Sequence, residues 1–160
     1  PPLGCDPIDD HFVVYNGIRI LGLGGCRRYR PGAHQYTEAQ MRRRIRRLKL
    51  QLWLYKGVDV VVTHAAPADL GDAEDPPHRG FESLRALLDK YHPQYLVHGH
   101  VHMNYGHGLP REIDYNGTRV INAYERCTFE IPDREYPLGQ HGQVLYKTWY
   151  HPHPLEDYLI

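Results

Sequence analysis

Cysteine is scarce in this sequence, and its spacing excludes several classes of protein. The 160 residues contain three cysteines, Cys5, Cys26 and Cys127, an odd number that cannot pair completely within one chain. None of them shows the C-x-x-C spacing of zinc or redox motifs. A disulfide-stabilised secreted domain is therefore not expected, and the sequence favours reduced thiols in a cytoplasmic protein.

Net charge and long apolar runs are also lacking. Lys and Arg number 19, and Asp and Glu also number 19, so the formal net charge is zero. This balance provides no overall field to attract nucleic acid or an anionic membrane. No apolar run is long enough to cross a bilayer, and no signal-peptide pattern is present. We expect neither a membrane nor a nucleic acid as partner.

The remaining pattern is typical of one α/β domain with a substantial core. Strands are predicted where β-branched runs occur, helices where apolar residues recur every three or four positions, and hairpins around two Asn-Gly pairs. The expected elements are a hairpin at 12–21, a helix at 38–56, a strand at 58–63, a helix at 81–91, a strand at 95–98, a hairpin at 113–121 and strands at 127–131 and 144–150.

The helix at 38–56 is predicted in most detail. Thr37 is its expected N-cap, with Gln40 completing a capping box. One buried stripe should contain Met41, Ile45, Leu48 and Leu52, widened by Leu50 and Trp53. The basic residues of the opposite face suggest nucleic-acid binding, but solvated surface is the favoured interpretation.

A cluster of imidazoles follows the strand at 95–98. In His98-Gly99-His100-Val101-His102, three histidines occupy alternate positions. They share one face if the strand continues, whereas a turn at Gly99 points His100 and His102 to different sides of one site. Neutral imidazole binds Zn, Mn, Fe and Ni. The pattern favours a metal site over a strand end with solvated rings.

His64 directly follows the other buried strand, in Thr63-His64-Ala65-Ala66-Pro67. One helical segment separates the two strands, as in a parallel β-α-β unit. Parallel strands gather their carboxyl ends at one edge of a sheet. We therefore expect His64, His100 and His102 to converge.

The Thr63–Pro67 and Gly99–His102 segments resemble the last two motifs of the calcineurin-like metallophosphoesterase superfamily. The resemblance implies an α/β fold in which this chain forms part of a two-sheet β-sandwich flanked by helices. It also implies two divalent transition metals, Mn, Fe, Zn or Ni. His64 and His100 would share one metal, and His102 would hold its neighbour.

The sequence departs from the family in its first half. The family's Asp-x-His and Gly-Asp-x-x-Asp motifs are lacking, and Gly4-Cys5-Asp6 resembles only a remnant of the third motif. Cys5 would take the place of a catalytic histidine. Residues 1–131 are thus expected to be the C-terminal part of such a domain, with its N-terminal strands absent. The missing half or a second chain would complete the site.

Substrate contacts are expected from two loops. Arg27 and Arg28, which follow the glycine-rich segment 22–25, either clamp an anionic substrate or are solvated. That segment itself is interpreted as a tight strand exit. The long loop 67–80 should overhang the metals, with His78 as a second catalytic candidate and Arg79 as a phosphate contact. The family often carries a similar His-x-Gly before its next helix.

The predicted function is metal-dependent hydrolysis of phosphomonoesters or phosphodiesters. The alternative is a non-catalytic scaffold or interaction module with an incomplete hydrolytic site. Because half of a sandwich would leave apolar faces exposed, we expect a homo-oligomer. Residues 132–160 are expected to form a partly irregular extension that packs on a neighbouring chain.

Overall fold

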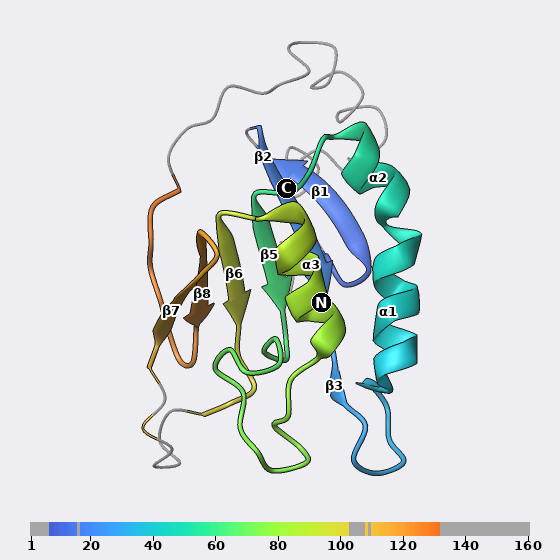
Figure 1. Cartoon of the computed structure of the whole chain (residues 1–160), viewed down its shortest axis with the longest axis vertical. Coiled ribbons are helices and arrows are strands. Elements are labelled where there is room, and N and C mark those ends of the chain that lie inside the picture. The colour runs from blue at the N-terminus through green and yellow to red at the C-terminus, as the bar shows by residue number, and fades with distance from the viewer. Residues whose placement is uncertain (1–6, 16, 103–107, 109, 132–160) are drawn as a thin grey trace, which may run out of the picture.

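A mixed six-stranded sheet lies at the centre of the computed structural model, which describes residues 7–15, 17–102, 108 and 110–131. The strand order is β1-β2-β5-β6-β8-β7 (Figure 1). Strands β2, β5, β6 and β8 run parallel, and each edge strand is antiparallel to its neighbour. The bounds are β1 His11–Tyr15, β2 Ile18–Leu23, β5 Val60–Thr63, β6 Tyr95–His98, β7 Glu112–Tyr115 and β8 Thr118–Asn122.

Both predicted hairpins form the two edges of this sheet. Asn116 and Gly117 have φ values of 49° and 83°, as a type I′ turn requires, and Gly17 has a φ of 80° in the first hairpin. The predicted strand 144–150, the extension 132–160 and Cys5 lie outside the described residues.

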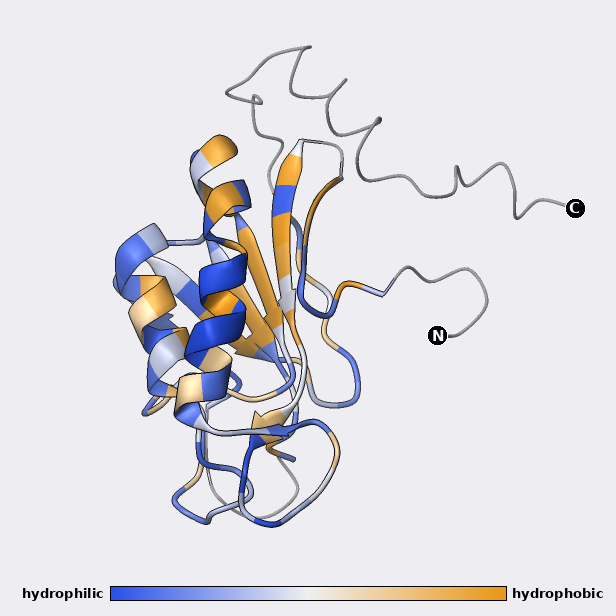
Figure 2. Cartoon of the chain, turned by 90° about the vertical axis from the view of Figure 1, so that its right-hand side faces the viewer, coloured by the Kyte–Doolittle hydropathy of each residue, from blue (hydrophilic) through white to orange (hydrophobic). Residues whose placement is uncertain are grey.

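Three helices, α1 (Glu38–Arg47), α2 (Lys49–Leu54) and α3 (Glu82–Tyr91), cover one face of the sheet (Figure 2). The capping box of Thr37 and Gln40 is present at the start of α1. The single helix expected at 38–56 is interrupted at Leu48, where ψ is −1° and the N–H bonds to the carbonyl of Ile45. This prediction was wrong because an apolar stripe does not reveal a local tightening of the backbone.

The burial of Leu50 and Trp53 was also wrongly predicted. The stripe itself is confirmed, since Leu48 and Leu52 are only 5% and 1% exposed. Leu50 is 62% exposed and Trp53 is 74% exposed. At 100° per residue, Leu50 lies on nearly the opposite side of a helix from Leu48, so an apolar residue near the stripe does not necessarily belong to it.

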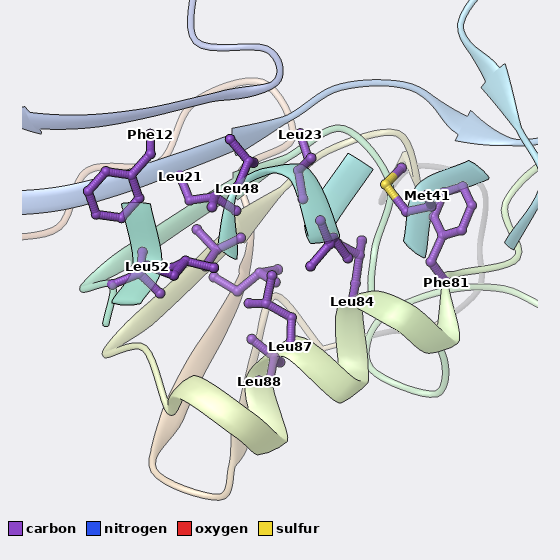
Figure 3. Close-up of a cluster of buried hydrophobic side chains, with 14 of the residues drawn as sticks. Phe12, Leu21, Leu23, Met41, Leu48, Leu52, Phe81, Leu84, Leu87 and Leu88 are labelled. Carbon is purple, nitrogen blue, oxygen red and sulfur yellow. The ribbon is translucent and has the colours of Figure 1, made fainter. Parts of the chain in front are cut away.

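The main core fills the space between the sheet and the helices. Figure 3 shows side chains from all three helices interlocking with those of β1 and β2. Burying each large apolar side chain contributes about 1.5–3 kcal/mol, so the helices are held mainly by this packing. The members labelled in Figure 3 are Phe12, Leu21, Leu23, Met41, Leu48, Leu52, Phe81, Leu84, Leu87 and Leu88.

The opposite face of the sheet is only partly covered by described residues. Residues 127–131 pack there against Tyr95, whose ring lies 4.9 Å from that of Phe129. The segment forms no strand, which corrects the sequence prediction; it is held instead by the Tyr95 hydroxyl, which donates to the Glu130 carbonyl. Besides the main sheet, the described residues form only the short parallel pair of β3 (Cys26–Arg27) and β4 (Gln35–Tyr36).

The glycine-rich exit of β2 is shaped by the chain that crosses it. A Cβ atom on Gly22 would lie 2.1 Å from the carbonyl oxygen of Ile8. The N–H of Gly24 donates to the carboxylate of Asp9, which also pairs with Arg44 of α1. These glycines therefore allow close chain approach. None of the helices in the described part is long and apolar enough to cross a membrane.

A buried ion pair joins β2 to the start of β5. The Arg19 guanidinium donates to both carboxylate oxygens of Asp59, at 2.9 and 2.6 Å, and to the carbonyls of Tyr55 and Lys56 at 2.8 Å. Both side chains are almost fully buried. Arg19, held by Asp59, thus fixes the chain as it leaves α2 and enters the sheet.

Replacing Asp59 with Asn should lower the free energy of unfolding by about 3–5 kcal/mol, because the Arg19 charge then stays buried without its partner. The matched control is Asp69→Asn, which removes the partner of Arg85 at a carboxylate that is 76% exposed. That change should cost less than about 1 kcal/mol. Denaturant titration measures both values, and equal losses would contradict a structural role for the Asp59 pair.

Candidate metal and phosphate site

Two histidines meet at the carboxyl edge of the parallel strands. His64 follows β5 and donates its backbone N–H to Leu23 of β2, while Gly99, after β6, donates its N–H to the His64 carbonyl. The first bond extends the parallel pairing of β2 with β5 beyond the strands themselves, and the second extends that of β5 with β6. The rings of His64 and His100 lie 4.6 Å apart, so the expected convergence of these two residues is present.

The turn that presents His100 differs from the expected one. His100 itself has a left-handed backbone with φ of 64°, whereas Gly99 has no positive φ. Such a conformation is uncommon for a residue with a side chain and is often found at functional sites. The sequence predicted the turn at Gly99, because glycine adopts a positive φ at the least cost.

Asn122 holds this turn in place. Its buried side chain donates to the carbonyl of Val101 at 2.8 Å and accepts from the N–H of Tyr124 at 3.0 Å. Sequence reasoning placed Asn122 only at the end of a hairpin. Its position beside β6 depends on the parallel pairing of β8 with β6, which no local pattern indicates.

The loop 67–80 lies against His100. The ring of His78 is 4.9 Å from that of His100. The Nδ1 atom of His78 is 2.6 Å from the carboxylate of Asp75. The Nε2–H of His100 donates to the carbonyl of Pro77 at 2.8 Å. Asp75 therefore emerges as a partner of His78 that the sequence did not single out.

The other predicted site residues have different surroundings. His102 is exposed, and its ring packs 4.7 Å from that of Tyr124. Arg27 donates to the carbonyl of Gly80 at 3.0 Å, which ties β3 to the end of the His78 loop. Arg28 is exposed in a separate hollow of the segment 28–32, and Arg79 lies in an acidic hollow with Asp69, Asp72 and Glu74.

Burial favours the neutral form of two imidazoles at this edge, those of His64 and His98. Partial burial lowers the pKa of His64, and the neighbouring His100 lowers it further. Burial also lowers the pKa of His98, which lies beneath the turn with only 2% exposure, and Asp72 opposes this shift. Neutral imidazole is the form that binds metals, so the electrostatics suit a ligand role for His64.

The donor set within the described ranges is incomplete for a metal centre. No group of three or more His, Cys, Asp or Glu side chains in this part of the chain is arranged to hold an ion. The rings of His64 and His78 each lie within 5 Å of that of His100, at 4.6 and 4.9 Å, and Cys5 lies outside the described residues. Further ligands for the predicted centre would have to come from elsewhere.

Comparison with known proteins identifies a shared fold. No family model and no curated protein matches the sequence. One solved crystal structure matches 74% of the chain with a TM-score of 0.52 and 19% identity. The protein TT1561 of Thermus thermophilus matches 73% of it with a TM-score of 0.50 and 16% identity. The chain spans 45% and 48% of these two structures, about half their lengths.

Stability should fall as the pH is lowered below about 6.5, where an unfolded imidazole becomes protonated. The lowered pKa of His98 means that the unfolded chain binds more protons in this range, which favours unfolding. His98→Gln should flatten the pH dependence of the unfolding free energy. The control His92→Gln, at an exposed histidine, should leave it unchanged. An unchanged slope in His98→Gln would contradict the predicted shift.

Proposed function

We propose that this chain contributes to the metal-dependent hydrolysis of phosphomonoesters or phosphodiesters at a dinuclear centre. The observation that carries the proposal is the 4.6 Å approach of His64 and His100 at the ends of adjacent parallel strands. The resemblance of the segments 63–67 and 99–102 to metallophosphoesterase motifs supports it. The solved structures provide support for the fold alone.

His64 and His100 would share one ion, and His102 would hold its neighbour. Imidazole donors suit Mn, Fe, Zn or Ni, and two such ions would act as Lewis acids on the phosphoryl group. The bond from His100 Nε2–H to Pro77 leaves Nδ1 as the ring atom with a free lone pair. The lowered pKa of His64 favours its neutral, ligating form.

His78 would handle a proton beside these ligands. Its Nδ1–H is oriented by Asp75, and its Nε2 would carry the proton for the leaving oxygen of the ester. Arg28 and Arg79 are exposed cations in two separate hollows, and the phosphate contacts predicted for them would require their loops to approach the histidines. The guanidinium of Arg27 is engaged with Gly80, so it would position the His78 loop.

The proposal requires groups that the described residues do not supply. A second sheet would complete the sandwich by packing on the sheet face opposite the helices, where Ile18, Ile20, Val62 and Val97 are only partly buried. Further sequence or a second chain would provide this sheet together with the remaining ligands. If a second copy of this chain covers that face, the expected homo-oligomer would be explained.

The complete gene product should hydrolyse p-nitrophenyl phosphate or its diester only when Mn, Fe, Zn or Ni is supplied. His100→Asn, which suits the left-handed backbone, should reduce the rate by at least about 100-fold, since even groups that merely support metal ligands contribute 10–100-fold. His92→Asn is the matched control, because His92 is exposed and also left-handed, with φ of 43°. Equal activity of the two variants would contradict the proposal.

The same assay tests the role of His78. His78→Gln should slow the hydrolysis of an alkyl phosphate by about 100-fold or more, the usual contribution of a general acid. It should slow p-nitrophenyl phosphate much less, because nitrophenolate leaves without being protonated. Equal losses on both substrates would assign His78 to binding or structure.

A non-catalytic scaffold is the second candidate. It is favoured by the internal hydrogen bonds of the imidazoles, since Pro77 accepts from His100 and Asp75 pairs with His78 within the chain itself. A folded gene product without hydrolytic activity under every one of the four metals would support this alternative.

A further inference from the structure

An apolar groove with a basic rim lies at the other end of the molecule from the histidines. It has a volume of about 780 Å³ and is formed by the ends of α2 and α3. Gly57 and Tyr91, which line it, precede β5 and β6, so the groove is at the amino edge of the parallel strands (Figure 1). The candidate metal site at the carboxyl edge is separate from it.

The groove combines apolar walls with charge of one sign. Leu52, Trp53, Leu54 and Tyr91 provide the apolar surface. The lysines at positions 49, 56 and 90 are exposed around it, and the described residues that line it include no carboxylate. An indole that is 74% exposed is unusual on a protein surface and is typical of a binding site. The occupant should therefore be both acidic and apolar.

The chain itself contains a segment of this chemistry. Residues 155–160, Leu-Glu-Asp-Tyr-Leu-Ile, lie outside the described residues and place Glu156 and Asp157 between apolar neighbours. Leu155, Tyr158 and Leu159 recur at the spacing of one apolar helix face. We propose that this segment binds the groove, with its apolar side chains against Trp53 and its carboxylates facing the lysines.

The length of the intervening chain allows this contact. Residues 132–154 provide 23 residues between the described part and the segment. An extended chain of that length reaches roughly 75 Å, because each residue spans up to about 3.3 Å. A domain of this size is roughly 35 Å across, so the segment can reach the groove of its own chain or that of a second copy.

Trp53 reports directly on the occupancy of the groove. The full chain carries two tryptophans, Trp53 and Trp149, so Trp149→Phe leaves Trp53 as the single indole. Its fluorescence should be blue-shifted and poorly quenched by acrylamide. Adding Glu156→Lys and Asp157→Lys should release the segment, shift the emission to longer wavelength and raise the quenching constant severalfold.

Charge exchange in the groove provides the second measurement. Lys56→Glu together with Lys90→Glu should restore protection of Trp53 in the charge-reversed chain. Asp133→Lys with Glu135→Lys is the matched control, because it makes the same charge change elsewhere in residues 132–160 and should leave Trp53 protected. Circular dichroism checks that each variant is folded.

The competing occupants give different results. An indole that is freely quenched in the starting chain would overturn the proposal. If Trp53 stays protected after Glu156 and Asp157 are changed to Lys, the groove is occupied by a surface other than residues 155–160. That result would overturn the proposal, and loss of the protection on dilution would assign the surface to a second copy. Protection that appears only with anionic phospholipid vesicles would assign it to a membrane. Protection that depends on Glu156 and Asp157 supports the proposal, and its concentration dependence distinguishes the same chain from a second copy.

Discussion

The parallel pairing of β5 with β6 is the constraint on which the candidate site depends. It places the ends of two strands that are about 35 residues apart in the sequence at one edge of the sheet. The bond from Gly99 N–H to the His64 carbonyl extends that alignment into the loops. The two imidazoles therefore meet through backbone hydrogen bonds, and the left-handed backbone of His100 is accompanied by the hydrogen bonds of Asn122 to Val101 and of His100 to Pro77.

Much of the fold could be predicted because its signals are local. The capping box at Thr37, the Asn116-Gly117 turn and the β-branched run of β5 each act within a few residues. Convergence of His64 and His100 followed from one general rule, that parallel strands share an edge. These features required no knowledge of distant contacts.

The features that were missed depend on neighbours that are distant in sequence. The tightening at Leu48 that separates α1 from α2 has no signal in the apolar stripe, and Leu50 and Trp53 are exposed although an apolar residue in a helix suggests burial. His100 adopts the left-handed conformation beside a glycine because Asn122, from β8, fixes the following turn. Periodicity and turn propensity do not include such tertiary contacts.

The two edges of the sheet thus have distinct chemistry. The imidazoles of His64 and His100 meet at the carboxyl edge, while an exposed indole with lysines lies at the amino edge. The core and the Arg19–Asp59 pair hold both edges on one rigid frame. The proposed metal site and the proposed binding groove therefore lie at opposite edges of one sheet.

The most direct measurement is an NMR titration of the imidazole nitrogens with Zn²⁺, using His92 as an internal reference. Shared ligation predicts that the His64 and His100 signals change together, and that His64→Asn abolishes the change at His100. The reference signal should remain unchanged throughout. Independent responses of His64 and His100, or none at saturating zinc, would contradict the claim that these two residues hold one ion.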